Sequence, residues 1–271
     1  MKVIRTDMVN GYEIIDFHCH IYPEKIAAKA VAGTDAFYRE HSKHLGTPAD
    51  LASCSGGIDR FVVHSVATTP AQVGKINEYI AAEAAANPAL IGFGTLHPAS
   101  DDIDGDVSRL VSLGLHGVKM HPEIQGIPID DPRCLKIYGL CEKHGLIVLL
   151  HTGDRRYDMS NPNRLMPLAR SHPGLKLVGA HFGGYTIWEE ASRLLADLDS
   201  LFVDSSSSLP YLSPKTAKEI IRRFGADHVL FGTDYPMHDP AEEISRMLSL
   251  GLTDDEYRKI FSENAARLLG L

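Results

Sequence analysis

The 271-residue sequence lacks several features that would assign it to particular classes of protein. No apolar stretch approaches the roughly 20 residues that a membrane-spanning helix needs. The N-terminal segment MKVIRTDMVNGYE is too polar for a secretory signal peptide. The four cysteines show no CxxC spacing, which predicts ordinary reduced thiols. We therefore expect a cytoplasmic protein that makes no contact with a membrane.

An excess of positive charge is also missing. Lysine and arginine number 27 against 35 aspartates and glutamates, and the formal net charge is -8. Because nucleic acids and anionic membranes are bound through basic surfaces, this balance disfavours a polyanionic partner. There is no internal repeat, no composition shift and no low-complexity tract beyond Ser205 to Ser208. These absences indicate one domain over residues 1–271 and a small-molecule substrate, and leave open a homo-oligomer.

Short apolar runs alternate with longer amphipathic segments along the chain, a pattern typical of strand–helix units around a parallel sheet. The predicted strands are residues 13–20, 60–68, 90–98, 117–122, 146–153, 176–184, 201–206 and 228–236. The predicted helices are residues 73–86, 107–114, 134–144, 165–172, 187–198, 214–225 and 241–251. Eight such units in about 250 residues predict an α/β fold, the (β/α)8 TIM barrel.

Two segments interrupt this regular spacing. Residues 23–59, between the first and second strands, are longer than one helix requires. Residues 154–163, DRRYDMSNPN, form a polar loop after the fifth strand. Both follow the carboxyl ends of strands, where active sites of such barrels lie. We expect the first segment to form a small cap over that face and the second to form its rim.

The apolar runs end in residues that can bind a metal or move a proton. These residues are His18, His20, His64, His97, Lys119, His121, His151, His181, Asp204 and Asp234. Because side chains alternate along a strand, His18 and His20 point to one side and Cys19 to the other. Asp16 would then lie one layer deeper on the same face, where it could orient an imidazole.

Each of these residues also has an ordinary structural interpretation. His151 could bond a carbonyl at a strand end, and Asp234 could begin a turn before Pro236. His97 and His121 precede prolines and are interpreted as plain strand exits. The joint pattern is harder to explain in this way, because five such residues would meet at one mouth of the barrel. They are two histidines after strand one, one histidine each after strands five and six, and an aspartate after strand eight. This convergence predicts a metal site.

The ordered motifs DFHCH, GVKMHPEIQG, VLLHTGD, GAHFGG and LFGTDYP resemble the amidohydrolase superfamily. The resemblance is to its amidohydrolase 2 branch, which groups small metal-dependent hydrolases with aminocarboxymuconate-semialdehyde decarboxylase-like enzymes. It implies a zinc ion, one per chain with two as the alternative, held by His18, His20, His151 and Asp234. TatD-type nucleases resemble the chain less, because they place a glutamate where Lys119 stands.

The resemblance also implies catalytic roles. Asp234 and His181 would handle protons, and His181 and Lys119 would contact the substrate or, if present, a second metal. For an anionic substrate, Lys119, Arg155 and Arg156 are the candidate cations. We expect a hydrolase that acts on an amide, ester or lactone through metal-activated water. The alternative is a decarboxylase of a small unsaturated or aromatic carboxylate, and a third hypothesis is a non-catalytic metal-binding barrel.

Overall fold

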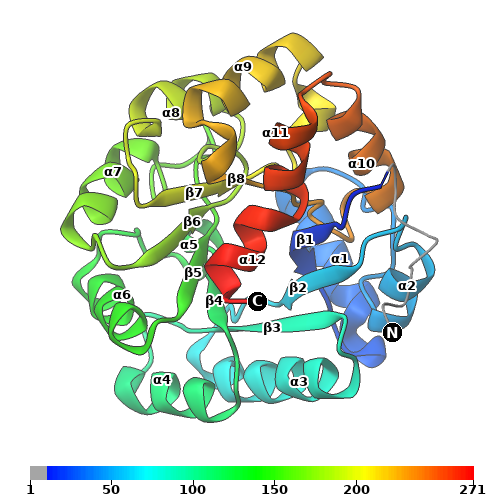
Figure 1. Cartoon of the computed structure of the whole chain (residues 1–271). Helices are drawn as coiled ribbons and strands as arrows, with labels where there is room; N and C mark the ends of the chain where they lie inside the picture. The colour runs from blue at the N-terminus through cyan, green and yellow to red at the C-terminus, as the bar shows by residue number, and fades with distance from the viewer. Residues whose placement is uncertain (1–10) are drawn as a thin grey trace.

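The structure is a computed structural model that describes residues 11–271, so most of the polar N-terminal segment lies outside the described residues. Eight parallel strands follow one another in chain order around a barrel (Figure 1). They are β1 (Ile15–His20), β2 (Arg60–His64), β3 (Leu90–Thr95), β4 (Gly117–Met120), β5 (Ile147–Leu150), β6 (Lys176–Gly179), β7 (Leu201–Asp204) and β8 (Val229–Leu230). This arrangement confirms the predicted (β/α)8 fold.

Helices surround the strands, and the seven predicted from the sequence are all present. They are α3 (Val73–Ala86), α4 (Ile103–Ser112), α6 (Pro132–His144), α7 (Pro162–Ser171), α8 (Trp188–Leu195), α9 (Pro214–Phe224) and α10 (Pro240–Leu248). Several begin at a polar cap followed by proline, as at Asp131 and Ser213, whose side chains accept backbone N–H groups. Their apolar faces pack against the outside of the strands.

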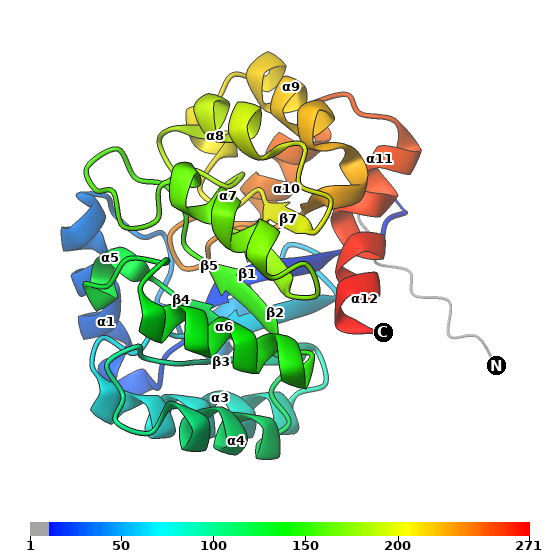
Figure 2. The ribbon, with the colours of Figure 1, turned by 90° about the vertical axis from the view of Figure 1, so that its left-hand side faces the viewer.

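Five further helices were not predicted: α1 (Glu24–Tyr38), α2 (Pro48–Ser53), α5 (Pro122–Gln125), α11 (Asp254–Arg258) and α12 (Asn264–Leu269). The first two occupy the segment 23–59 that was expected to form the cap. Helix α12 lies across one end of the barrel (Figure 1), where Ala265, Leu268 and Leu269 pack with interior residues such as Phe17 and Phe93. Helices α1 and α5 lie on the side away from α12 (Figure 2).

The seam between β8 and β1 is closed by backbone hydrogen bonds beyond the short β8 strand. Phe17 N–H donates to the carbonyl of Phe231 at 2.8 Å, and His20 N–H donates to that of Tyr235 at 2.7 Å. Asp234 N–H returns a bond to the carbonyl of His18 at 3.0 Å. The end of β1 and the turn after β8 are therefore held side by side, which places their polar side chains together.

Among residues 11–271, no helix combines the length and the apolar character that crossing a membrane requires. The four cysteines are all free thiols, and three of them are buried.

Candidate metal centre

His18 and His20 leave the end of β1 toward the mouth of the barrel. Their ring centroids lie 5.3 Å apart, and Cys19 between them packs in the outer apolar layer. The alternation of side chains along a strand predicted this shared direction. His18 is fully buried and His20 is partly exposed. Burial lowers the pKa of His20 to about 4, although the Asp234 carboxylate beside it acts in the opposite direction.

Asp234 approaches the same two imidazoles from the turn after β8. Its Oδ1 atom lies 3.4 Å from the Nε2 atom of His18 and 3.4 Å from that of His20. Ser207 Oγ donates to its other oxygen, Oδ2, at 2.5 Å. Burial acts to raise the pKa of Asp234, but the neighbouring imidazoles, His18 foremost, hold it well below its ordinary value. Asp234 thus presents one free carboxylate oxygen to two histidines.

Asp16 does not orient an imidazole, so that interpretation was wrong. The pairing of β1 with β2 shifts register between Asp16 and Cys19, which breaks the alternation that placed Asp16 beneath His18. Its carboxylate instead accepts the N–H groups of His18 and Thr233, each at 3.0 Å, and the hydroxyl of Thr233 at 2.5 Å. Asp16 therefore fixes the turn that carries Asp234 to the end of β1.

His151 and His181 follow β5 and β6 and face one another. His181 Nδ1 lies 2.9 Å from the carbonyl oxygen of Ser206, which only accepts, so Nδ1 carries the proton and Nε2 a lone pair. His151 Nδ1 lies 3.0 Å from that Nε2 atom. Among the described residues, His18, His181 and Asp234 have donor atoms within 4.8 Å of one another. His151 adjoins this group through His181.

Asp204, at the end of β7, organises two of these histidines, although the sequence analysis gave it no role beyond that of a strand-end residue able to bind a metal or move a proton. Its Oδ2 atom lies 2.9 Å from His18 Nδ1, and its Oδ1 atom accepts the backbone N–H groups of His181 at 3.1 Å and Ser206 at 3.0 Å. A carboxylate at Nδ1 keeps the proton there and turns the Nε2 lone pair of His18 toward the cavity. Asp204 was visible in the sequence only as another acid at a strand end.

Lys119 is fully buried at the end of β4, with its Nζ atom 3.0 Å from His18 Nε2. Burial lowers its pKa to about 8, and the carboxylates of Asp204, Asp234 and Glu123 oppose that shift. Lys119 therefore lies beside His18, and its contact with substrate or a second metal stays a prediction. His64, from β2, adds a third imidazole beside this pair, 4.4 Å from His20 between ring centroids.

His121 is more than a plain strand exit. Its ring stacks on that of His151 at 4.0 Å with an interplanar angle of 8°, and its Nε2 atom lies 2.5 Å from the hydroxyl of Tyr38. Glu123 lies beside both histidines, with Oε2 3.4 Å from His121 Nδ1 and 4.0 Å from His151 Nε2. Within residues 11–271, neither Glu123 Oε2 nor His151 Nε2 has a hydrogen-bond partner. In the sequence, the signal available for this pair was the spacing of His121 and Glu123, two residues apart in the motif HPE.

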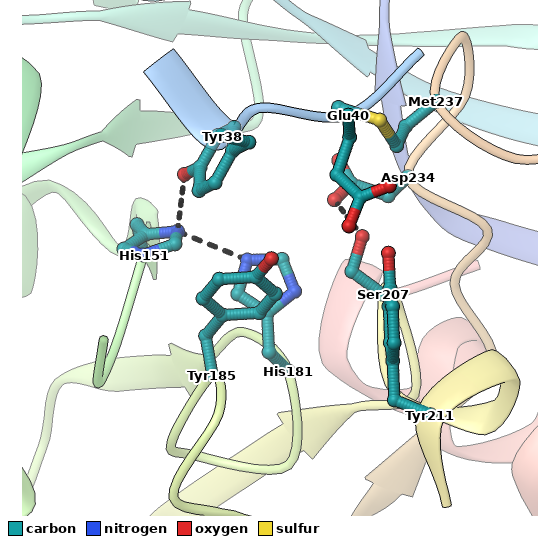
Figure 3. Close-up of a pocket in the computed structure, with 9 residues that line it drawn as sticks. All are labelled: Tyr38, Glu40, His151, His181, Tyr185, Ser207, Tyr211, Asp234 and Met237. Atoms are coloured by element: carbon teal, nitrogen blue, oxygen red, sulfur yellow. Dashed lines mark hydrogen bonds between the residues drawn. The ribbon is translucent and has the colours of Figure 1, made fainter. Parts of the chain in front are cut away.

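These side chains open into a narrow cavity (Figure 3). It is lined by Tyr38, Glu40, His151, His181, Tyr185, Ser207, Tyr211, Asp234 and Met237. Tyr38 and Glu40 come from the end of α1 and the residues after it, so the segment 23–59 does cover this face. The cavity volume of about 10 Å³ is room for roughly one water molecule. A larger ligand must therefore displace lining side chains.

Arg155 and Arg156 do not line this cavity. The guanidinium of Arg156 binds the buried carboxylate of Asp154, with Nη2 2.6 Å from Oδ2, and donates to the carbonyl of Phe37 at 2.6 Å. Arg155 donates to the carbonyl of Thr186 at 2.6 Å. Both cations are engaged in holding loops together, which corrects their prediction as substrate contacts. The position of Arg156 in the sequence, after β5, could not reveal that the carboxylate of Asp154 would bind its guanidinium.

The lone pairs at this centre fit a divalent metal ion. His18 and His181 each have Nδ1 committed to an acceptor, so their Nε2 atoms carry lone pairs that now face Lys119 and His151. His151 Nδ1 and His181 Nε2 face each other at 3.0 Å, and Asp234 Oδ1 lies between His18 and His20. Imidazole nitrogens with one carboxylate are a donor set typical of zinc and other first-row divalent ions.

Comparison with known proteins gives the same family as the motifs. The family model described as amidohydrolase matches residues 15–271. A curated relative, 2-amino-3-carboxymuconate-6-semialdehyde decarboxylase of Dictyostelium discoideum, is 24% identical over 266 residues, covering 91% of this chain and 69% of its own length.

Solved structures share the fold. The 5-carboxyvanillate decarboxylase of Sphingomonas paucimobilis superposes with a TM-score of 0.75 at 17% identity, over 96% of this chain and 100% of its own. A dihydroxybenzoic acid decarboxylase of Polaromonas sp. JS666, solved with bound manganese, gives a TM-score of 0.72 at 16% identity, over 96% of this chain and 97% of its own. Because the family model spans the barrel from β1 to the C-terminus, this chain belongs to the amidohydrolase family.

Proposed function

We propose that this protein is a metal-dependent, non-oxidative decarboxylase of a small aromatic or unsaturated carboxylate. The observation that carries the proposal is the curated relative, a decarboxylase by name, which matches 91% of the chain. The solved structures named above are also decarboxylases. These comparisons favour the decarboxylase alternative over the hydrolase that the sequence led us to expect first.

We place one divalent metal on His18, His20, His151 and Asp234, with His181 beside it. Zinc was the expected ion, but the relatives solved with manganese widen the proposal to either metal. When bound, the ion would supply positive charge that holds the substrate's carboxylate or a neighbouring oxygen. Lys119, whose Nζ atom lies 3.0 Å from His18 Nε2, adds a second cation behind the residues that line the cavity.

The remaining chemistry belongs to the side chains around the cavity. Decarboxylation breaks the bond between the substrate carbon and its carboxylate, carbon dioxide leaves, and the carbon takes up one proton. Asp234 and His181 both face the cavity and are the groups placed to relay that proton (Figure 3). Each must first take it from water, because Asp234 is ionised and His181 Nε2 carries a lone pair. Ser207 orients Asp234, and the carbonyl of Ser206 orients His181. Tyr38 and Tyr185 close the site against water.

The test is an assay of the metal-loaded enzyme that measures released carbon dioxide. The panel sets hydroxybenzoates and unsaturated carboxylates against lactones, esters and amides of similar size. We expect carbon dioxide from a carboxylate, and loss of at least about 100-fold in kcat for Asp234→Asn. Hydrolysis of a lactone, ester or amide without any release of carbon dioxide would return the assignment to the hydrolase.

A further inference from the structure

The cavity above the metal centre has an uneven distribution of charge. Among the described residues that line it there is no lysine or arginine, whereas two carboxylates, Asp234 and Glu40, are present. The charge of Asp234 lies against His18 and His20 at the floor. Glu40 reaches the cavity from the segment that covers it, and Figure 3 shows its carboxylate in front of Asp234, beside Ser207 and above the hydroxyl of Tyr211. The metal site would therefore be cationic when metal is bound, and the covering segment in front of it carries an anion.

The position of Glu40 is set by the backbone around it. Helix α1 ends at Tyr38, and the next residue, Arg39, adopts a left-handed conformation at φ 60°. The N–H groups of Arg39 and Glu40 both donate to the carbonyl of Asp35. This reversal turns the chain back over the mouth of the barrel. Lys43 N–H then donates to the carbonyl of Pro236 at 3.0 Å, two residues after Asp234. The segment that carries Glu40 is thus anchored to the loop that carries Asp234.

No side chain described in residues 11–271 is placed to neutralise Glu40. The two arginines expected nearby are committed elsewhere, Arg156 to Asp154 and Arg155 to the carbonyl of Thr186. The groups that share the outer part of the cavity with Glu40 are neutral hydroxyls, those of Tyr185 and Tyr211. Because the cavity has room for roughly one water molecule, a substrate cannot enter without contacting this end.

From this arrangement we infer that Glu40 selects substrates that carry a single carboxylate and, at the far end, a hydroxyl or amino group that donates to it. The inference rests on the proposed function in one respect: the substrate's carboxylate is directed to the metal. A second carboxylate at the far end would meet Glu40 as a like charge in a partly desolvated cavity. A hydroxyl or amino group there would form a charge-assisted hydrogen bond instead.

The experiment measures binding of matched probes to the metal-loaded enzyme by calorimetry. The probes are 3- and 4-hydroxybenzoate, and the corresponding benzene-1,3- and 1,4-dicarboxylates. We expect at least one hydroxybenzoate to bind on the order of tenfold more tightly than its dicarboxylate counterpart. In Glu40→Gln this preference should disappear, and in Glu40→Lys it should reverse. The control is Glu24→Gln, which removes an exposed charge from the first turn of α1, the helix that precedes Glu40.

Three results would overturn the inference. The wild type could bind both members of each pair equally, it could bind no probe, or Glu40→Gln could keep the preference unchanged. The outcome is separable from the proposed function, because binding is measured without turnover. A preference that depends on Glu40 in an enzyme that releases no carbon dioxide would retain the selectivity and refute the decarboxylase.

Discussion

At the scale of single residues, the candidate metal centre depends on groups that are not among its proposed ligands. Asp204 Oδ2 lies 2.9 Å from His18 Nδ1 and accepts its proton, and Asp204 Oδ1 accepts the backbone N–H of His181. We predict that Asp204→Asn weakens divalent-metal affinity by about 10–100-fold, because the amide neither carries the charge nor fixes the tautomer of His18. Titration of zinc or manganese against a competing chelator measures this loss.

The control for this prediction is Asp102→Asn. Asp102 accepts the N–H of Gly105 at the start of α4 and is exposed, so it should leave metal affinity unchanged. If Asp204→Asn binds metal as tightly as the wild type while remaining folded by circular dichroism, the orienting role assigned to Asp204 is wrong.

The sequence predicted the residues of this centre better than their orientation. His18, His20, His151, His181 and Asp234 could be identified because strand ends in a parallel barrel share one mouth. The direction in which each side chain points depends on tertiary contacts, which a sequence pattern does not contain. The register shift in β1 redirected Asp16, and the buried Asp154 bound Arg156. Whether these histidines and Asp234 bind metal stays a prediction for measurement.

At the scale of elements, the loops after β5 and β6 are joined at the wall of the site. Gly153 pairs with Tyr185, and a Cβ at Gly153 would lie 2.5 Å from the backbone nitrogen of Tyr185. Its φ of +81° also disfavours any side chain. We predict that Gly153→Ala lowers the free energy of unfolding by roughly 1–3 kcal/mol and displaces Tyr185 from the cavity. Denaturant unfolding measures the first effect.

The matched control is Gly145→Ala at the end of α6. Gly145 has a similar φ of +67°, yet nothing lies within 4 Å of the Cβ it would gain. It should therefore show only the cost of the left-handed conformation, about 1 kcal/mol. Equal losses for the two variants would mean that the close approach of the two loops contributes nothing to stability.

Three of the helices that escaped prediction, α1, α2 and α5, are short or have little apolar contrast. Helix α1 is rich in alanine, and Ala27 is its only fully buried residue, so no apolar stripe revealed it. Helices α2 and α5 span only six and four residues. The strands and outer helices were predictable because each buries an apolar run or face. The cap, which carries Tyr38 and Glu40, was recognised as an insertion but its side chains could not be placed.

At the scale of the whole molecule, the candidate metal centre lies at the seam where the barrel closes. Two of its residues, His18 and His20, belong to β1, and Asp234 follows β8. Across this seam β8 contributes only two residues to the sheet, and closure relies on a few backbone bonds and on Asp16. A metal held from both sides would link the first and last strands of the barrel.

Metal removal should therefore destabilise the entire fold. A ligand at a hundred times its Kd stabilises the folded state by about 2.7 kcal/mol. For a chain of this size, that corresponds to a fall in Tm of roughly 5–10 °C when the wild type is stripped with a chelator. Calorimetry with and without added zinc or manganese measures the shift.

The double variant His18→Ala with His20→Ala serves as the reference for this measurement. It lacks both β1 donors, so its Tm should be low and independent of added metal. The wild type and the variant must differ in their response to metal, because only the wild type can join β1 to the Asp234 turn through an ion. A wild-type Tm that is the same with metal and with chelator would show that the seam is held by protein contacts alone.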